Sequence, residues 1–242
     1  MLWILEHIDQ LNTDAVLSLL PRLSESRRAR VRSVTHVPSK VRSILAELLL
    51  RHALRAEYGL TELPRIETGE KGKPFFPDHP ELHFNLSHCQ TAVACAVDTS
   101  PVGVDVEACG RLCRGGTLTS ASSELSRGGG HQPPATLAIL RVLSEPERQW
   151  VEQGKTPEEQ DRRFTAVWTC KEAWGKAAGQ GLLYDLRSTD FRPKTRPWLQ
   201  YGCVFRQLDL GNTLLTLCSA APLRLHRIGA SRLFTFFQEE TP

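Results

Sequence analysis

The chain has 242 residues, of which 40% are hydrophobic and 24% are charged, and its formal net charge is +3. This composition is ordinary for a globular protein of one large domain or two small ones, and so small a net charge does not favour a general nucleic-acid binder. The seven cysteines include no Cys-x-x-Cys pair, which predicts reduced thiols in a cytoplasmic protein and not a disulfide framework. No apolar stretch reaches the roughly 18 residues that a membrane span requires, so we expect a soluble protein.

The first part of the chain is basic. Between Arg22 and Arg55 it carries nine Lys and Arg residues against two Glu residues. Such a run is usually a solvated helix face, but it also fits a phosphate-rich ligand, because the forked head of arginine suits phosphate groups. The elements predicted here are a strand over residues 3–8, a short helix capped by Thr13 that reaches residue 20, and an amphipathic helix over residues 39–58 that ends at Gly59.

The middle of the chain predicts a turn and then two paired strands. Gly72-Lys73-Pro74 is typical of a turn, and residues 83–87 and 92–97 predict strands joined just after His88. The adjacent Ser87 and His88 raise the possibility of a hydrolase. Neighbours on a strand point to opposite faces, however, and no Gly-x-Ser-x-Gly elbow surrounds the serine. The nearby histidines also match no recognised zinc spacing.

The next predicted strand has two different faces. Val102, Val104 and Val106 alternate with Gly103, Asp105 and Glu107. The valine face predicts core, while the glycine would let a ligand approach the backbone of the other face. Two neighbouring carboxylates repel each other unless a cation lies between them, and Mg²⁺ is usually held by one or two carboxylates together with substrate phosphates. A solvated strand face is the alternative.

One long helix is predicted after Thr156, because Pro157 suits the first helical position and Gly179 can close the C-terminus. Glu172 and Lys176 lie four residues apart and therefore project from the same face. Most such pairs are surface ion pairs that stabilise a helix by roughly 0.2–0.5 kcal/mol.

Three further predicted segments contain no candidate site residue. Residues 109–134 are rich in Gly, Ser and Pro, which predicts a flexible loop. Residues 201–210 and 213–221 predict a hairpin, and residues 232–237 predict a last edge strand.

Four motifs, taken in order, resemble those of the Sfp-type 4′-phosphopantetheinyl transferases. They are Gly72-Lys73-Pro74, Phe84-Asn85-Leu86-Ser87-His88, Gly103-Val104-Asp105-Val106-Glu107, and Trp-x-x-Lys-Glu-Ala-x-x-Lys-x-x-Gly-x-Gly-Leu over residues 168–182. Each motif alone is weak, but four in order with compatible spacings are specific. The chain departs from the family at residues 109–134, because such enzymes usually pass more directly to a Ser-x-x-Glu cap, here at residues 144–147.

The resemblance implies an α+β fold of two similar α+β subdomains in a pseudo-twofold arrangement, with the active site between them. Residues 1–100 would form the N-terminal subdomain that binds coenzyme A, and residues 101–242 would form the metal-binding and catalytic subdomain. The insertion near residues 109–134 directly follows the predicted metal strand, so we expect it to border the surface where a carrier protein docks. A two-lobed chain needs no second copy to complete its site, which favours a monomer.

The resemblance also implies a magnesium-dependent enzyme of the holo-[acyl-carrier-protein] synthase type. It would transfer the 4′-phosphopantetheine arm of coenzyme A to a serine of an apo acyl or peptidyl carrier protein and release 3′,5′-ADP. The partners would be coenzyme A and carrier domains of fatty acid, polyketide or nonribosomal peptide biosynthesis, without nucleic acid or membrane.

The family pattern assigns roles to residues of this chain by their place in the motifs and in the basic segment. Mg²⁺ would be held by Asp105, Glu107 and Glu172. Glu172 would also take the proton of the attacking serine, and Lys176 would balance charge on the leaving phosphate. Coenzyme A would be bound by Arg27, Arg30, Arg42, Ser43, Lys73, Ser87 and His88.

Two alternatives belong to other functional classes. The chain could be a non-catalytic binder of acidic carrier domains. It could also be a nucleic-acid-binding module that uses the basic helix within residues 22–55, and its binding would then fall steeply with salt.

Overall fold

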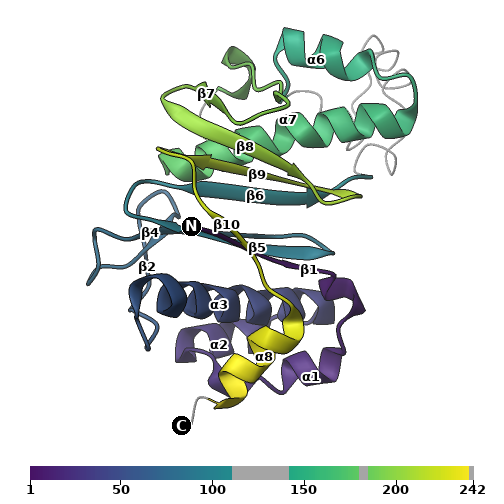
Figure 1. Cartoon of the computed structure of the whole chain (residues 1–242). Helices are drawn as coiled ribbons and strands as arrows, with labels where there is room; N and C mark the ends of the chain where they lie inside the picture. The colour runs from purple at the N-terminus through teal and green to yellow at the C-terminus, as the bar shows by residue number, and fades with distance from the viewer. Residues whose placement is uncertain (111–141, 180–184, 240–242) are drawn as a thin grey trace, which may run out of the picture.

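The computed structural model describes residues 1–110, 142–179 and 185–239. Within these ranges groups of helices follow groups of strands along the chain (Figure 1). The strands are β1 Leu2–Glu6, β2 Glu67–Thr68, β3 Pro74–Phe75, β4 His83–His88, β5 Ala92–Asp98, β6 Gly103–Ala108, β7 Trp198–Gln200, β8 Cys203–Asp209, β9 Thr213–Ser219 and β10 Leu225–Arg227. The α-helices are α1 Thr13–Leu17, α2 Glu25–Ser33, α3 Val37–Tyr58, α6 Glu145–Glu152, α7 Pro157–Ala178 and α8 Ala230–Glu239. Three 3₁₀ turns are η1 Ile8–Gln10, η2 Leu20–Arg22 and η3 Leu186–Ser188.

Two four-stranded sheets lie face to face between two layers of helices (Figure 1). The first sheet has the strand order β10-β1-β5-β4, and the second has the order β6-β9-β8-β7. Neighbouring strands are antiparallel except for β1 and β10, which are parallel. Helix α3 packs on the outer face of the first sheet, with α1, α2 and α8 against α3. Helix α7 packs on the outer face of the second sheet, with α6 against α7 (Figure 1). The predicted α+β fold is therefore confirmed.

The valine face of β6 forms core, as its alternation predicts. Val102, Val104 and Val106 are buried between the sheets against Leu2, Ile4, Leu215 and Leu217. The opposite face of β6 is not solvated, because α7 packs on it and Asp105 is only 3% exposed. This burial excludes a water-exposed strand face as the explanation of Asp105, whereas Glu107 at the end of this face is half-buried.

Both long helices begin and end close to their predicted bounds. The Thr156 side chain accepts a hydrogen bond from the Glu159 N–H at the start of α7, and Gly179 ends that helix with φ 66°. Gly59 ends α3 in the same left-handed conformation, with φ 70°. Glycine adopts this conformation without the steric penalty of other residues. Helix α3 begins two residues earlier than predicted, with Pro38 in its first turn.

The prediction for the short first helix is wrong in its cap and its length. Asn12 is the N-cap of α1, since its side chain accepts a hydrogen bond from the Ala15 N–H at 3.0 Å. Thr13 is the first helical residue, and the helix ends at Leu17. Asparagine is at least as good a cap as threonine, so the choice between two adjacent candidates is not decided by residue type.

The predicted edge strand over residues 232–237 is also wrong, because these residues lie in α8. Leu233 and Phe237 are four residues apart and fully buried in the core that α8 shares with α3. The guanidinium carbon of Arg51 on α3 lies 5.0 Å from the centre of the Phe237 ring. Aromatic residues favour strands by propensity, but packing of one helical face against α3 outweighs that preference.

The C-terminal segment returns to the first sheet. Strand β10 pairs in parallel with β1, with Leu225 opposite Leu2, and α8 packs on α3. The last strand and helix therefore lie with the N-terminal half of the chain (Figure 1). The division into subdomains at about residue 100 remains a prediction.

The flexible loop predicted for residues 109–134 falls outside the described residues from position 111 onward. Its first two residues are held by the second half of the chain. The Cys109 N–H donates to the Asn212 carbonyl at 2.9 Å, and the Gly110 N–H donates to the carboxylate of the buried Asp161.

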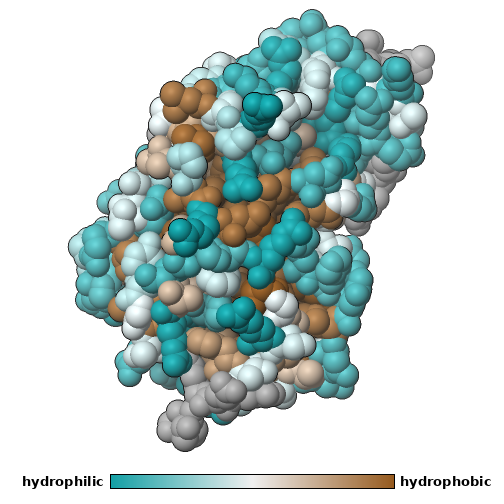
Figure 2. All heavy atoms as spheres, viewed as in Figure 1, coloured by the Kyte–Doolittle hydropathy of each residue, from teal (hydrophilic) through white to brown (hydrophobic). Residues whose placement is uncertain are grey.

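Hydrophobic side chains are exposed mainly near the middle of the face shown in Figure 2, at the level of the sheets, whereas hydrophilic residues cover the helical ends. Among the helices of the described residues, none combines the length and the apolar character needed to cross a membrane.

Candidate active site

A cavity of about 450 Å³ opens between the two halves of the chain. Its walls come from α2 and α3 on one side and from β6 and α7 on the other, with β3 and β4 between them. The lining residues are Arg27, Arg30, Ala46, Pro74, Leu86, Ser87, His88, Asp105, Glu107, Trp168, Glu172 and Lys176. The predicted metal-binding and catalytic residues thus share one cavity with several of the predicted phosphate ligands.

Strand β4 joins the two sheets through side chains. Strand β6 is at the edge of its sheet, and its backbone finds partners on β4. Asn85 Oδ1 accepts a hydrogen bond from the Val104 N–H at 2.9 Å, and Ser87 Oγ accepts one from the Val106 N–H at 3.2 Å. These side chains take the place of a neighbouring strand. The motif alone does not predict a role for Asn85, although its spacing of two from Ser87 puts both on one face of β4.

Asp105 is the centre of the polar contacts in the cavity. Its Oδ1 accepts hydrogen bonds from Ser87 Oγ at 2.9 Å and from Lys176 Nζ at 2.6 Å. Lys176 Nζ also donates to the Val104 carbonyl at 3.2 Å. The second carboxylate oxygen, Oδ2, is buried and has no hydrogen-bond partner among the residues that the structure describes. An unsatisfied buried acceptor is costly, so this oxygen is suited to a ligand that supplies positive charge.

Gly103 explains why β6 and α7 lie so close together. A Cβ atom at this position would lie 2.0 Å from the Ala173 carbonyl oxygen and 2.5 Å from the Ala177 nitrogen. The expectation that this glycine admits a ligand to the strand backbone is wrong, because the helix backbone occupies the space. The close approach brings Lys176 on the helix within reach of Asp105 on the strand.

A buried ion pair anchors α7 next to Glu172. Lys171 Nζ lies 2.9 Å from Glu147 Oε2, and both side chains are fully buried. Glu147 also accepts hydrogen bonds from the Ser144 and Phe191 N–H groups, each at 2.7 Å. Burial lowers the pKa of Lys171, while the Glu147 carboxylate opposes that shift. The sequence predicts the Ser144–Glu147 cap but not the pairing of Glu147 with Lys171.

The basic wall of the cavity is held in place by a buried carboxylate. Arg27 Nε donates to Glu47 Oε2 at 3.2 Å, and Arg27 Nη1 donates to Ser43 Oγ at 3.3 Å. Glu47 is 1% exposed and also accepts a hydrogen bond from the Ser24 N–H at 2.6 Å. Ser43 therefore orients Arg27 instead of lining the cavity itself, while Arg30 does line it.

The cavity has a basic wall with Arg27 and Arg30 and an acidic wall with Asp105, Glu107 and Glu172. His88 lies at the end of β4, where these two walls meet. Although the residue is exposed, the protein around its ring lowers its pKa, and the positive charges of Arg42, Lys176 and Arg27 lower it further. The ring is therefore neutral near pH 7 and lies in a positive field. Arg42 does not line the cavity, and it donates a hydrogen bond to Ser39 Oγ at 2.9 Å.

Lys73 is separated from the other predicted ligands of coenzyme A. Its Nζ donates to the Ala177 carbonyl at 2.9 Å, at the end of α7. The residue lines a second cavity of about 450 Å³, on the other side of Pro74. Burial lowers the pKa of Lys73. The structure therefore does not bring this ammonium group together with Ser87 and His88.

Comparison with known proteins identifies the family. Residues 101–216 match the model of the 4′-phosphopantetheinyl transferase superfamily. The chain is 30% identical over 214 residues to a 4′-phosphopantetheinyl transferase of Bacillus subtilis. The aligned region covers 84% of this chain and 85% of the relative. It is 33% identical to the 4′-phosphopantetheinyl transferase psf-1 of Bacillus pumilus, over 70% of this chain and 64% of that protein. The chain belongs to the 4′-phosphopantetheinyl transferase superfamily.

As a 4′-phosphopantetheinyl transferase, the chain is an enzyme that transfers phosphopantetheine to a carrier protein. The transferase carries the four motifs at places that the fold brings together. Three of them contribute to the cavity through Ser87, Asp105 and Glu172, and Pro74 of the remaining motif also lines it.

The family pattern predicts that the transferase holds Mg²⁺ with three carboxylates. Among the described residues, no three His, Cys, Asp or Glu side chains come close enough together to hold a metal ion as they stand. The donor set nevertheless suits Mg²⁺, which takes oxygen ligands and usually needs only one or two protein carboxylates beside phosphates and water. The buried Asp105 Oδ2 without a partner is the observation that fits such an ion.

Proposed function

We propose that this transferase uses coenzyme A and Mg²⁺ to modify a serine of an apo acyl or peptidyl carrier protein. The serine oxygen attacks the β-phosphorus of coenzyme A and forms a new P–O bond. The bond from this phosphorus to the bridging pyrophosphate oxygen breaks, and 3′,5′-ADP leaves with the electron pair. The serine proton passes to a base of the enzyme, so that atoms and charge balance.

The acidic wall supports this assignment. Glu172 lines the cavity one helical turn from Lys176 and is the candidate base, since general-base help typically contributes about 10²–10⁴-fold to a rate. The Lys176 ammonium group already bonds Asp105, so we infer that it positions this carboxylate and adds positive charge near the leaving phosphate. Asp105, with Glu107 or Glu172, would hold Mg²⁺. When bound, the ion would neutralise the pyrophosphate.

The basic wall supports coenzyme A as the donor of the group. The nucleotide end of coenzyme A carries a 3′-phosphate and a pyrophosphate. Arg27 and Arg30 line the cavity opposite the carboxylates, and Arg27 is oriented by Glu47. His88 lies where the two walls meet. Arginine binds phosphates through its fixed fork of N–H donors, and orientation by a buried carboxylate lowers the entropy lost on binding.

The single observation that carries the proposal is the arrangement around Asp105. A solvent-shielded carboxylate is paired with Lys176 on one oxygen. Its other oxygen is buried, without a hydrogen-bond partner in the described part of the chain, in a cavity that has a basic wall. A non-catalytic binder of acidic carrier domains has no need for such a carboxylate, so we do not favour it. The other predictions that remain are a cytoplasmic location, a monomeric state and the absence of nucleic-acid partners.

Mass spectrometry tests the proposal directly. The purified chain is incubated with coenzyme A, Mg²⁺ and either an apo acyl carrier protein or an apo peptidyl carrier protein. We expect a phosphopantetheine adduct on the carrier and an equal amount of 3′,5′-ADP. The adduct should be absent with EDTA, and it should be absent when the acceptor serine of the carrier is replaced by alanine.

The same assay separates the alternatives. Binding of the carrier protein to the chain without any adduct would support a non-catalytic binder. Binding of DNA or RNA that falls steeply between low and high salt, without adduct formation, would support a nucleic-acid module.

A further inference from the structure

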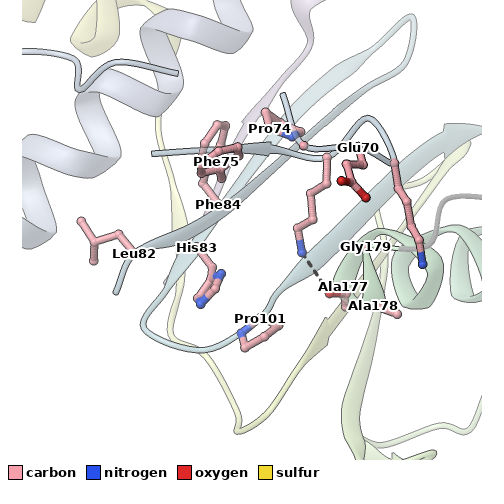
Figure 3. A pocket seen from close by; sticks show the side chains of 13 residues that line it. Glu70, Pro74, Phe75, Leu82, His83, Phe84, Pro101, Ala177, Ala178 and Gly179 are labelled. Carbon is pink, nitrogen blue, oxygen red and sulfur yellow. Dashed lines mark hydrogen bonds between the residues drawn. The ribbon is translucent and has the colours of Figure 1, made fainter. Parts of the chain in front are cut away.

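The side chain of Lys73 crosses from the β2–β3 hairpin to the other half of the molecule. The hairpin turn is closed by hydrogen bonds from the Gly69 N–H to the Lys73 carbonyl at 3.0 Å and from the Gly72 N–H to the Gly69 carbonyl at 2.8 Å. Gly72 has φ +83°, which favours glycine. From this turn the Lys73 ammonium group reaches the Ala177 carbonyl at 2.9 Å, shown as the dashed line in Figure 3.

The acceptor of this bond is at the C-terminal end of α7. The last four carbonyls of a helix have no partner within it, and they carry the negative end of the helix dipole. The Gly179 N–H bonds to the Lys176 carbonyl, and Lys73 supplies a donor and a positive charge to the carbonyl of Ala177. The aliphatic stem of Lys73 also packs beside Gly179, since a Cβ there would lie 3.4 Å from the Lys73 Cδ.

The second acceptor of Lys73 lies on the segment that leads into β6. Its Nζ lies 3.5 Å from the Val102 carbonyl oxygen, immediately before Gly103. Gly103 is the point where β6 touches the α7 backbone at Ala173 and Ala177. Lys73 therefore hydrogen-bonds both α7 and the residue before β6, at the end of the closest contact between helix and strand.

The same two elements carry the acidic wall of the active site. Lys176 directly precedes Ala177, and Asp105 follows Gly103 by two residues. A change in the angle or spacing of α7 and β6 at this point would move Lys176 relative to Asp105. Misplacement of reacting groups by about 1 Å can cost on the order of 10²-fold in rate.

We propose that the Lys73 side chain is a positioning group that caps α7 and holds it against β6, and that its ammonium group does not bind coenzyme A. This inference rests on the proposed transferase function. Pro74, the next residue, lines the active-site cavity, so the cap also fixes the place of one cavity wall relative to the catalytic helix.

Kinetics of three variants test the inference. Lys73→Met keeps the stem and removes the donor and the charge, while Lys73→Arg keeps a cation. Lys71→Met removes an exposed lysine from the same turn and is the matched control. For Lys73→Met we expect kcat to fall about tenfold or more while KM for coenzyme A stays within about threefold. Lys73→Arg should recover part of kcat, and Lys71→Met should match the unmodified protein.

Hydrogen–deuterium exchange gives a readout that does not depend on catalysis. In Lys73→Met the amides of residues 171–179 should exchange at least about threefold faster, because the helix end has lost its cap. Exchange in α3 should not change. If circular dichroism shows that Lys73→Met does not fold, Lys73→Gln, with a shorter and uncharged donor, takes its place.

The outcomes distinguish the two roles of Lys73. A tenfold or larger rise in KM for coenzyme A with unchanged kcat and unchanged exchange would overturn the positioning role and restore Lys73 as a ligand. Unchanged kinetics and exchange would overturn it as well. If the unmodified chain forms no carrier adduct, the proposed function fails, whereas the exchange measurement still decides whether Lys73 caps α7.

Discussion

Lys176 Nζ on α7 lies 2.6 Å from Asp105 Oδ1 on β6, and this ion pair crosses the contact where Gly103 lets helix and strand backbones meet. The Asp105 side chain is 5% exposed and that of Lys176 is 26% exposed, so water screens the pair only in part. The pair fixes the orientation of a carboxylate whose other oxygen has no hydrogen-bond partner within residues 1–110, 142–179 and 185–239.

Replacement of Asp105 or Glu172 by alanine should abolish transfer while the chain still binds coenzyme A. For Asp105→Ala and Glu172→Ala we expect kcat to fall by at least about 10²-fold, because the ion site and the candidate base lie on this wall. The dissociation constant of coenzyme A, measured by calorimetry without Mg²⁺, should change by less than about fivefold, because the basic wall is intact. Glu158→Ala alters an exposed residue in the first turn of α7 and should have no effect. Near-normal turnover in either active-site variant would contradict the assigned roles.

Binding of coenzyme A should strengthen as pH falls from about 7.5 to about 6, and His88 should cause part of this change. Its pKa lies below the ordinary 6.5, chiefly because the surrounding protein desolvates the ring. A bound phosphate favours the protonated ring and raises this pKa, so binding takes up a proton. Titration calorimetry in buffers of different ionisation enthalpy measures the uptake. His88→Gln should reduce it and weaken binding, whereas His79→Gln should not. Equal proton uptake in both variants would exclude His88 as a phosphate ligand.

Breaking the buried ion pair beside Glu172 should be strongly destabilising. Lys171→Met leaves the Glu147 carboxylate buried without its cation, and the free energy of unfolding should fall by about 3–5 kcal/mol. In the double variant Lys171→Met/Glu147→Gln the loss should be smaller, since no charge remains and the amide oxygen can still accept from the Phe191 N–H. Urea unfolding measures both. A double variant less stable than Lys171→Met would show that the hydrogen bonds of Glu147 matter more than its charge.

Gly103→Ala should disturb both stability and activity. The added methyl group would lie 2.0 Å from the Ala173 carbonyl oxygen, so α7 and β6 must separate. We expect a loss of about 1–3 kcal/mol or more in the free energy of unfolding, as for other overpacked sites, and a fall in kcat as Lys176 moves from Asp105. Gly229→Ala is the control, because no atom lies within 4 Å of its added Cβ. If Gly103→Ala is as stable as this control, α7 can move away from β6 at little cost in free energy.

Local signals in the amino-acid sequence determine much of the fold. The caps at Thr156 and Gly179 predict α7, and alternation over residues 102–107 predicts which face of β6 is core. These signals work because they depend on a residue's own conformational preference and on periodicity, both of which are readable within one segment. The prediction for residues 232–237 fails because helix and strand compete closely in an aromatic segment, and α3 decides the outcome.

The candidate site shows the same division between what local sequence signals determine and what contacts between distant segments decide. Residue types and their spacing determine which side chains carry the chemistry, since Asp105, Glu172, Lys176 and His88 stand out in the sequence and line one cavity. Only the tertiary structure decides what each of them contacts. The purpose of Gly103, the direction of Lys73, the pairing of Lys171 with Glu147, and the return of β10 to the first sheet all depend on contacts between segments far apart in the chain. Such contacts carry no local signature, because each partner alone is compatible with many others.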